Sequence, residues 1–296
     1  MLSFMYYIVY GIFYLLSLLP FWVLHLFSDF AYCIIYYGVG YRKDVVMKNL
    51  LQAFPDKTNQ ERVRLAKAFY HNFTDNFIET IKLISASPAF LKKHFTGDFS
   101  LCDQLYESGR KCQLLVGHNF NWEMAMLRMP LDIRHKFLVV YLKLSSPLFE
   151  RLIYKIRTRN GAVMLPATEM KQAIAPHLSS QYMLVLGADQ NPGSPRSSYW
   201  LNFFGKLTPF VSGPEKASRK DNIPILFCKF LKKKRGYYEI VFEMGAENPA
   251  SLPEGEITKR YVQFLQQFIT EHPEMWLWSH RRWKWEWKEE FGNLVQ

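Results

Sequence analysis

A histidine and a glutamate five residues apart are the side chains of this sequence best suited to catalysis. In the segment LLVGHNFNWE, an apolar run ends at Gly117, His118 follows, and Glu123 comes where a helix is predicted to begin. A carboxylate bonded to an imidazole fixes its tautomer and stabilises the imidazolium. The other ring nitrogen can then take a proton from an attacking hydroxyl. We therefore expect His118 to act as a general base that Glu123 orients. The spacing alone also fits a histidine with a purely structural role.

Two polar residues accompany this pair at the predicted strand ends. In an α/β sheet, ligands bind beyond the carboxyl ends of the strands. Asp189 directly follows one apolar strand, and Asn121 lies in the same block as His118. Both are candidate substrate-binding residues. Asp189 could instead position a loop, pair with Arg196, or form a turn before the Asn-Pro-Gly that follows it.

Three arginines are candidates for binding a phosphorylated substrate. Arg157 and Arg159 lie at the end of a predicted helix, and Arg196 lies in a loop after Asp189. The planar guanidinium group can bind two phosphate oxygens at once. The alternative for Arg157 and Arg159 is a pair of solvated charges that favour a helix C-terminus.

Alternating apolar strands and amphipathic helices must position these residues. A long helix is predicted over 57–84 from its regular apolar spacing. Strands are predicted at 113–116, 137–141, 182–186, 225–230 and 238–242, and helices at 121–129, 146–158, 168–179, 212–221 and 256–271. The pattern predicts one α/β domain over 42–296, with a mixed, mostly buried sheet flanked by helices. The basic loop 232–236 should be a hairpin turn whose charges face solvent or lipid headgroups.

Residues 1–41 are predicted to anchor the chain in a membrane. They contain one charged side chain, Asp29. A helix from Phe4 to Phe27 would extend roughly 36 Å, enough to cross a hydrocarbon core of about 30 Å, with a kink at Pro20. Insertion into one leaflet is the alternative. Arg42 and the basic residues after it place the body in the cytoplasm by the positive-inside rule.

The net charge of +11 indicates an anionic partner. A membrane surface or a phosphorylated ligand fits this charge, whereas scattered basic residues without a nucleic-acid motif argue against DNA or RNA. The cysteines form no CxxC pair and lie at no metal-ligand spacing from a histidine, so no metal is expected. There is also no Gly-x-Ser-x-Gly elbow, so a covalent acyl-enzyme is not expected.

Several blocks occur together in an order that resembles a known enzyme family. The His-x4-acid block is followed by LGADQNPGS at 186–194, by the FFG of 203–205, by Ile223-Pro224-Ile225, and by PEMWLWSHRRWK at 273–284. This combination resembles the late (secondary) acyltransferases of lipid A biosynthesis, the lauroyl/myristoyl transferases, within the glycerolipid-type acyltransferases. Glu123 stands where many members have Asp, and the segment after Gly205 is a loose version of the family pattern.

The resemblance implies an acyltransferase with no cofactor. It implies direct transfer of a fatty acyl group from acyl carrier protein, or less favourably from acyl-coenzyme A, to a hydroxyl of a phosphorylated glycolipid, a lipid A precursor. It also implies the bacterial inner membrane as the location, and a position for Asp189 close to the His118 block. Two alternatives stay open at this point: another polar lipid as acceptor, and a non-catalytic lipid-binding protein on the same scaffold.

Overall fold

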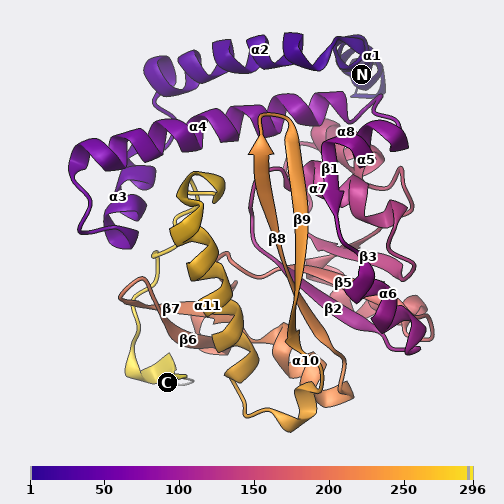
Figure 1. Cartoon of the computed structure of the whole chain (residues 1–296), viewed down its shortest axis with the longest axis vertical. Coiled ribbons are helices and arrows are strands. Elements are labelled where there is room, and N and C mark those ends of the chain that lie inside the picture. Colours follow the sequence, from indigo (N-terminus) through magenta and orange to yellow (C-terminus); the bar gives the residue numbers. More distant parts are fainter. Residues whose placement is uncertain (1, 292–293, 296) are drawn as a thin grey trace.

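The computed structural model describes residues 2–291 and 294–295 as an α/β fold with a seven-stranded sheet (Figure 1). The strand order is β1-β9-β8-β2-β5-β3-β4. Only β8 and β9 pair antiparallel, and the other five pairings are parallel. The strands are β1 (Phe95–Gly97), β2 (Cys112–Val116), β3 (Lys136–Tyr141), β4 (Val163–Pro166), β5 (Tyr182–Gly187), β8 (Ile225–Lys234) and β9 (Tyr237–Ala246). The predicted fold class, with its mixed and mostly buried sheet, is confirmed.

The helices of the body are α3 (Lys43–Ala53), α4 (Asn59–Lys82), α5 (Pro88–His94), α6 (Ser100–Glu107), α7 (Trp122–Arg128), α8 (Pro147–Arg157), α9 (Met170–Ile174), α10 (Gly213–Asp221) and α11 (Glu256–Glu271). Helices α4, α7, α8, α10 and α11 fall close to their predicted positions, and α3, α5 and α6 were not predicted. Helix α9 is shorter than the predicted 168–179. Pro176 has no backbone N–H to continue the α-helical hydrogen bonds, and the chain passes into a 3₁₀ turn over Ala175–His177. A capping box formed by Thr58 and Glu61 fixes the start of α4.

A small second sheet was not predicted. Strands β6 (Ser198–Phe203) and β7 (Lys206–Val211) form an antiparallel hairpin beside the main sheet. The segment after Gly205 therefore begins as a strand and enters helix α10 only beyond Ser212. Phe204 and Gly205 both have positive φ, 52° and 77°, and make the tight turn between the strands.

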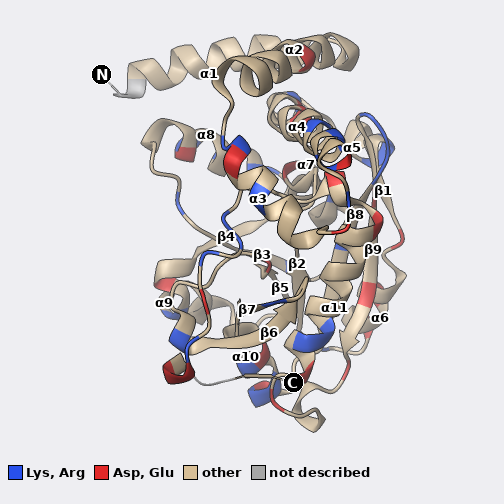
Figure 2. Cartoon of the chain, turned by 90° about the vertical axis from the view of Figure 1, so that its left-hand side faces the viewer, with Lys and Arg blue, Asp and Glu red and all other residues tan. Residues whose placement is uncertain are grey.

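The N-terminal apolar region forms two helices, so the single helix predicted from Phe4 to Phe27 is wrong. Helix α1 (Leu2–Leu18) ends before Pro20, and α2 (Phe21–Cys33) continues as a π-helical segment, Ile34–Val39. The stretch Phe21–Val39 is long and apolar enough to cross a membrane, as core helices and signal sequences can also be. Figure 2 shows that α1 and α2 carry almost no charge, in contrast to the body below them.

Helix α2 is attached to α4 through polar side chains on its underside. His25 Nε2 lies 2.9 Å from Glu79 Oε1, and the Ser28 hydroxyl donates to Asp75 at 2.7 Å. The side chain of Asp29 pairs with Arg235 at 2.7 Å. Figure 1 shows α2 lying along α4 across the top of the molecule. These polar groups of α2 thus find their hydrogen-bond and ion-pair partners within the protein. The inner face of α2 is therefore packed against the body.

The β8–β9 hairpin turn is confirmed, and Lys233 and Lys234 are exposed as predicted. The prediction that Lys232 and Arg235 also face solvent or lipid headgroups is wrong. Arg235 at the tip pairs with both Asp29 and Asp75, and Lys232 also reaches Asp75 at 3.4 Å. Asp75 is buried with 2% of its side chain exposed. Burial disfavours its carboxylate, but Arg235, Lys232 and Ser28 outweigh this and lower the pKa of Asp75. The hairpin therefore neutralises a buried charge beneath α2.

We predict that Arg235→Met destabilises the protein by on the order of 2–4 kcal/mol, because it leaves a buried carboxylate short of its main partner. Chemical unfolding in detergent measures the free energy. Lys233→Met in the same turn is the control, since Lys233 is 56% exposed and pairs at the surface with Glu239. A surface pair contributes about 0–1 kcal/mol. Equal effects of the two substitutions would contradict the docking role of Arg235.

Candidate active site

His118 and Asp189 meet at the carboxyl ends of two neighbouring parallel strands. His118 comes two residues after β2, Asp189 comes two residues after β5, and Val116 is paired with Gly187 in the ladder. His118 Nδ1 lies 2.6 Å from Asp189 Oδ1, and the His118 backbone N–H donates to Oδ2 at 2.8 Å. Because a carboxylate can only accept, Nδ1 carries the ring proton and Nε2 presents a lone pair.

The predicted hydrogen bond between Glu123 and the His118 imidazole is wrong. Arg157 Nε donates to Glu123 Oε2 at 2.9 Å, and Arg157 Nη2 donates to Oε1. Trp122 Nε1 also donates to Oε1 at 3.1 Å. Glu123 lies in the first turn of α7, as expected. Arg157, at the end of α8, donates to both of its carboxylate oxygens. The acid that contacts the imidazole is Asp189.

The electrostatics of the pair make His118 a stronger base than a free histidine. Burial disfavours the imidazolium, but the charge and hydrogen bond of Asp189 outweigh burial and raise the pKa of His118 above 6.5. Burial likewise opposes ionisation of Asp189, yet His118 and Trp276 lower the pKa of this carboxyl to about 2. Asp189 is 1% exposed, whereas 30% of the His118 side chain remains accessible. The site thus combines a buried, ionised acid with an accessible base.

Close packing sets the direction of the imidazole. A methyl group at Gly187 would come within 3.0 Å of His118 Cε1, so the end of β5 needs a residue without a side chain. The Trp122 indole meets the imidazole edge to face, with ring centroids 5.8 Å apart. These contacts leave the ring little freedom to rotate, which preserves the direction of its free nitrogen.

The C-terminal segment supports the site from the other side. Trp276 Nε1 donates to Asp189 Oδ2 at 2.8 Å. The Asn191 backbone N–H donates to His280 Nε2 at 3.1 Å, and burial lowers the pKa of His280 to about 4, so this ring is neutral and can accept. The fully buried Arg282 donates to the Asn191 side chain at 3.1 Å. Sequence reasoning grouped these residues in one block but missed that the block positions Asp189.

The other predicted substrate-binding residues have partners within the protein. The buried Asn121 caps α7 through the N–H of Met124 and donates to Glu79 at 2.9 Å. Arg159 donates to the carbonyl oxygens of Ile84 and Ala86. Arg196 is 71% exposed and faces Glu290 at 3.8 Å, so the pairing of Arg196 with Asp189 is wrong. Contact of these residues with substrate stays a prediction, and the hydrogen bonds now give Asn121 and Arg159 structural roles.

No metal-binding cluster is present in the part of the chain that the structure describes: three or more His, Cys, Asp or Glu side chains nowhere gather at ligand distance. His118 and Asp189 form a hydrogen-bonded imidazole–carboxylate pair beside the ion pair of Glu123 and Arg157. An imidazole braced in this way can activate a hydroxyl for attack on an acyl group.

Comparison with known proteins agrees with this chemistry. The sequence pattern of the bacterial lipid A biosynthesis acyltransferases matches residues 1–285. The chain belongs to this family and is an acyltransferase of the class that transfers groups other than aminoacyl groups. The resemblance predicted from the sequence blocks is therefore confirmed. A comparison with curated proteins gives no match.

We predict that Asp189→Asn lowers both the transfer rate and the pKa of His118. A general base must be neutral, so wild-type activity should rise with pH through a pKa above 6.5. Removing the carboxylate removes the contribution that raises this pKa, so the rising limb moves to lower pH. The plateau falls by roughly 10²- to 10⁴-fold, because the tautomer is no longer fixed.

The measurements are a pH–rate profile and an NMR titration of the His118 ring in both proteins. The titration needs no turnover, so it separates loss of the electrostatic contact from loss of fold. An unchanged His118 pKa in a folded Asp189→Asn variant would show that Asp189 does not tune the base.

Proposed function

We propose that this enzyme transfers a fatty acyl group from acyl carrier protein to a hydroxyl of a lipid A precursor, with His118 as general base. The observation that carries the proposal is the 2.6 Å contact between His118 Nδ1 and Asp189, which leaves Nε2 free. The family supports a lipid A precursor as acceptor. The net charge of +11 favours an acidic donor such as acyl carrier protein over acyl-coenzyme A alone.

The reaction proceeds by direct attack within a complex of enzyme, acceptor and donor. His118 Nε2 removes the proton of the acceptor hydroxyl, and the oxygen forms a bond to the thioester carbonyl carbon. The tetrahedral intermediate collapses, the carbon–sulfur bond breaks, and the imidazolium returns its proton to the departing thiolate. Asp189 stays ionised throughout and stabilises the imidazolium while it exists. The products are the acylated lipid and the free thiol of the carrier.

The ion pair of Glu123 and Arg157 supports this cycle without touching the imidazole. The charge of Glu123 raises the pKa of His118 and that of Arg157 lowers it, so the pair moderates the basicity set by Asp189. Both side chains are largely buried, at 9% and 17% exposed. We assign Glu123 and Arg157 a positioning role for α7 and α8 beside the site.

The transfer test uses His118→Ala with a lipid A precursor as acceptor. The donor is the acyl thioester of acyl carrier protein or of coenzyme A. We expect the rate of acylated lipid formation, followed by mass spectrometry, to fall by roughly 10²- to 10⁴-fold. His177→Ala, which removes an imidazole from a surface turn, is the matched control and should retain the rate. Wild-type rates in a folded His118→Ala protein would rule out the general base.

We also propose that the enzyme works at the bacterial inner membrane, with α1 and α2 lying in the bilayer interface. Their outer faces are exposed and apolar, and their inner faces are docked on the protein. The exposed residues are Phe4, Tyr7, Ile8, Ile12, Leu15, Leu18, Trp22, Leu26, Phe27 and Phe30. Lys82 donates to the backbone carbonyls of Ser17 and Leu19, which supplies hydrogen bonds to carbonyl groups at the C-terminal end of α1. This arrangement supports shallow insertion. The basic residues that begin at Arg42 favour a catalytic domain on the cytoplasmic side.

We predict that Leu26→Glu/Phe30→Glu releases the protein from vesicles of bacterial phospholipids in a flotation assay. Both side chains lie on the outer face, at 59% and 67% exposed, so the fold should persist while insertion is lost. Leu178→Glu, at a 50% exposed residue near α9, is the control and should leave flotation unchanged. Undiminished flotation of the folded double variant would contradict insertion through α2.

A further inference from the structure

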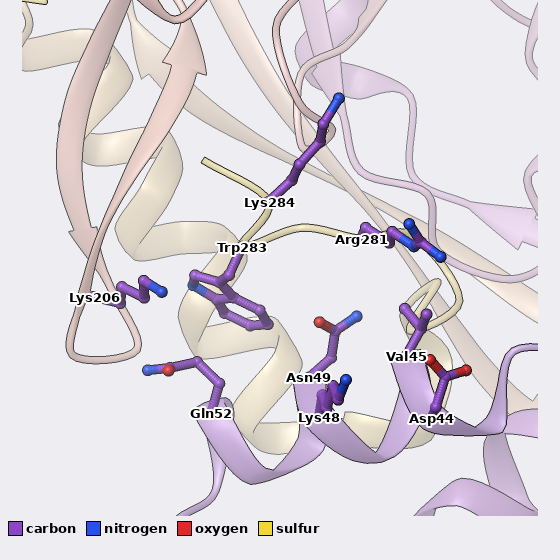
Figure 3. Close-up of a pocket in the computed structure, with 9 residues that line it drawn as sticks. All are labelled: Asp44, Val45, Lys48, Asn49, Gln52, Lys206, Arg281, Trp283 and Lys284. Carbon is purple, nitrogen blue, oxygen red and sulfur yellow. The ribbon is translucent and has the colours of Figure 1, made fainter. Parts of the chain in front are cut away.

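A basic groove lies outside the catalytic pair, between α3 and the C-terminal segment. Its volume is about 520 Å³. Figure 3 shows Lys48, Asn49 and Gln52 on α3 facing the segment that carries Arg281 and Trp283. Lys206 enters from the β6–β7 turn and points toward Trp283, while Lys284 lies at the rim and points away from α3. The remaining lining residues are Asp44 and Val45.

The groove concentrates unpaired positive charge. Among the residues that the structure describes, no carboxylate forms an ion pair with Lys48, Lys206, Arg281 or Lys284. By contrast, Arg235 in the β8–β9 hairpin pairs with both Asp75 and Asp29. Asp44 is the single acid in the lining, so the groove carries an excess of three positive charges. Such a cluster attracts an anion.

The groove and the catalytic pair share one structural element. Trp276 contacts Asp189, and five residues later Arg281 lines the groove. Asn191, two residues after Asp189, donates from its side chain to the Arg281 carbonyl at 2.7 Å. Asn49 of α3 in turn donates to the carbonyls of Trp278 and His280, both at 2.7 Å. The groove wall and the His118–Asp189 pair are therefore connected through this segment.

We propose that this groove binds a phosphate group of the acceptor glycolipid and so presents the acceptor hydroxyl to His118. Its volume is that of a small-molecule pocket, whereas docking of a carrier protein takes about 800 Å² of surface. Arginine and lysine suit phosphate, and the Trp283 indole offers a face for a sugar ring. The amide nitrogens of Asn49 and Gln52 donate to backbone carbonyls, and their side-chain oxygens can accept from sugar hydroxyls.

The position of α3 selects an amphiphile over a free anion. Helix α3 begins at Lys43, directly after the apolar region that ends with Tyr41. A lipid whose chains lie in the bilayer beside α1 and α2 would carry its phosphate to the level of α3. The inference rests on the proposed function, because it gives the acceptor of that reaction a second point of attachment.

The test compares a phosphorylated lipid A precursor with the same lipid after removal of its phosphate groups. Lys48→Gln/Arg281→Gln should raise KM for the phosphorylated acceptor by about tenfold, and kcat should change little. KM for the dephosphorylated acceptor should be nearly unchanged, since it has no phosphate to lose contact with. Lys171→Gln/Lys220→Gln, which removes two exposed lysines on α9 and α10, is the charge-matched control and should behave as wild type.

A binding measurement makes the outcome independent of turnover. The two lipids, each in detergent micelles, are titrated into the His118→Ala protein with and without the groove substitutions. Weaker binding of the phosphorylated lipid alone supports the groove even if the enzyme transfers to neither lipid, which would overturn only the proposed function. Equal loss for both lipids, or a rise in KM for acyl carrier protein instead of the lipid, would overturn the phosphate assignment.

Discussion

The buried carboxylate of Asp189 is the constraint on which the rest of the site depends. A charge that is 1% exposed is costly unless the protein supplies hydrogen bonds that replace water. Asp189 obtains them from the backbone and ring of His118 and from the indole of Trp276. These three donors come from two segments far apart in the sequence. Satisfying one carboxylate therefore fixes β2, β5 and the C-terminal segment relative to each other.

The hydrogen bonds around Asp189 also make the C-terminal segment a support of the site, although this segment, where the structure describes it, forms no hydrogen bond with the His118 ring nitrogens. Asn191 forms hydrogen bonds with His280, Arg281 and Arg282. The loop after Asp189 is therefore attached to residues 276–282. Arg282 is fully buried, and burial lowers its pKa to about 9. Its position is held by hydrogen bonds and by the Phe210 ring, 4.2 Å away. These contacts connect the wall of the basic groove to the loop that carries Asp189.

Polar contacts also explain why an apolar N-terminal region is integrated with the body. Helix α2 has the composition of a membrane helix, yet His25, Ser28 and Asp29 on its inner face meet Glu79, Asp75 and Arg235. A bilayer offers no partners for such groups. The division of α2 into an apolar outer face and a bonded inner face is what a helix at the boundary between lipid and protein requires.

The sequence by itself determined the fold class and most of the main sheet. Periodicity placed α4, α11 and five of the strands, because each buries a face that its own residues specify. It also placed His118 at a strand end. Only the tertiary structure decided which acid serves it, since Glu123 is close in sequence but is held by Arg157, while Asp189 is brought in by the pairing of β2 with β5. Strand order is set by long-range packing, which no local pattern encodes, and the hydrogen-bond partner of His118 follows from that order.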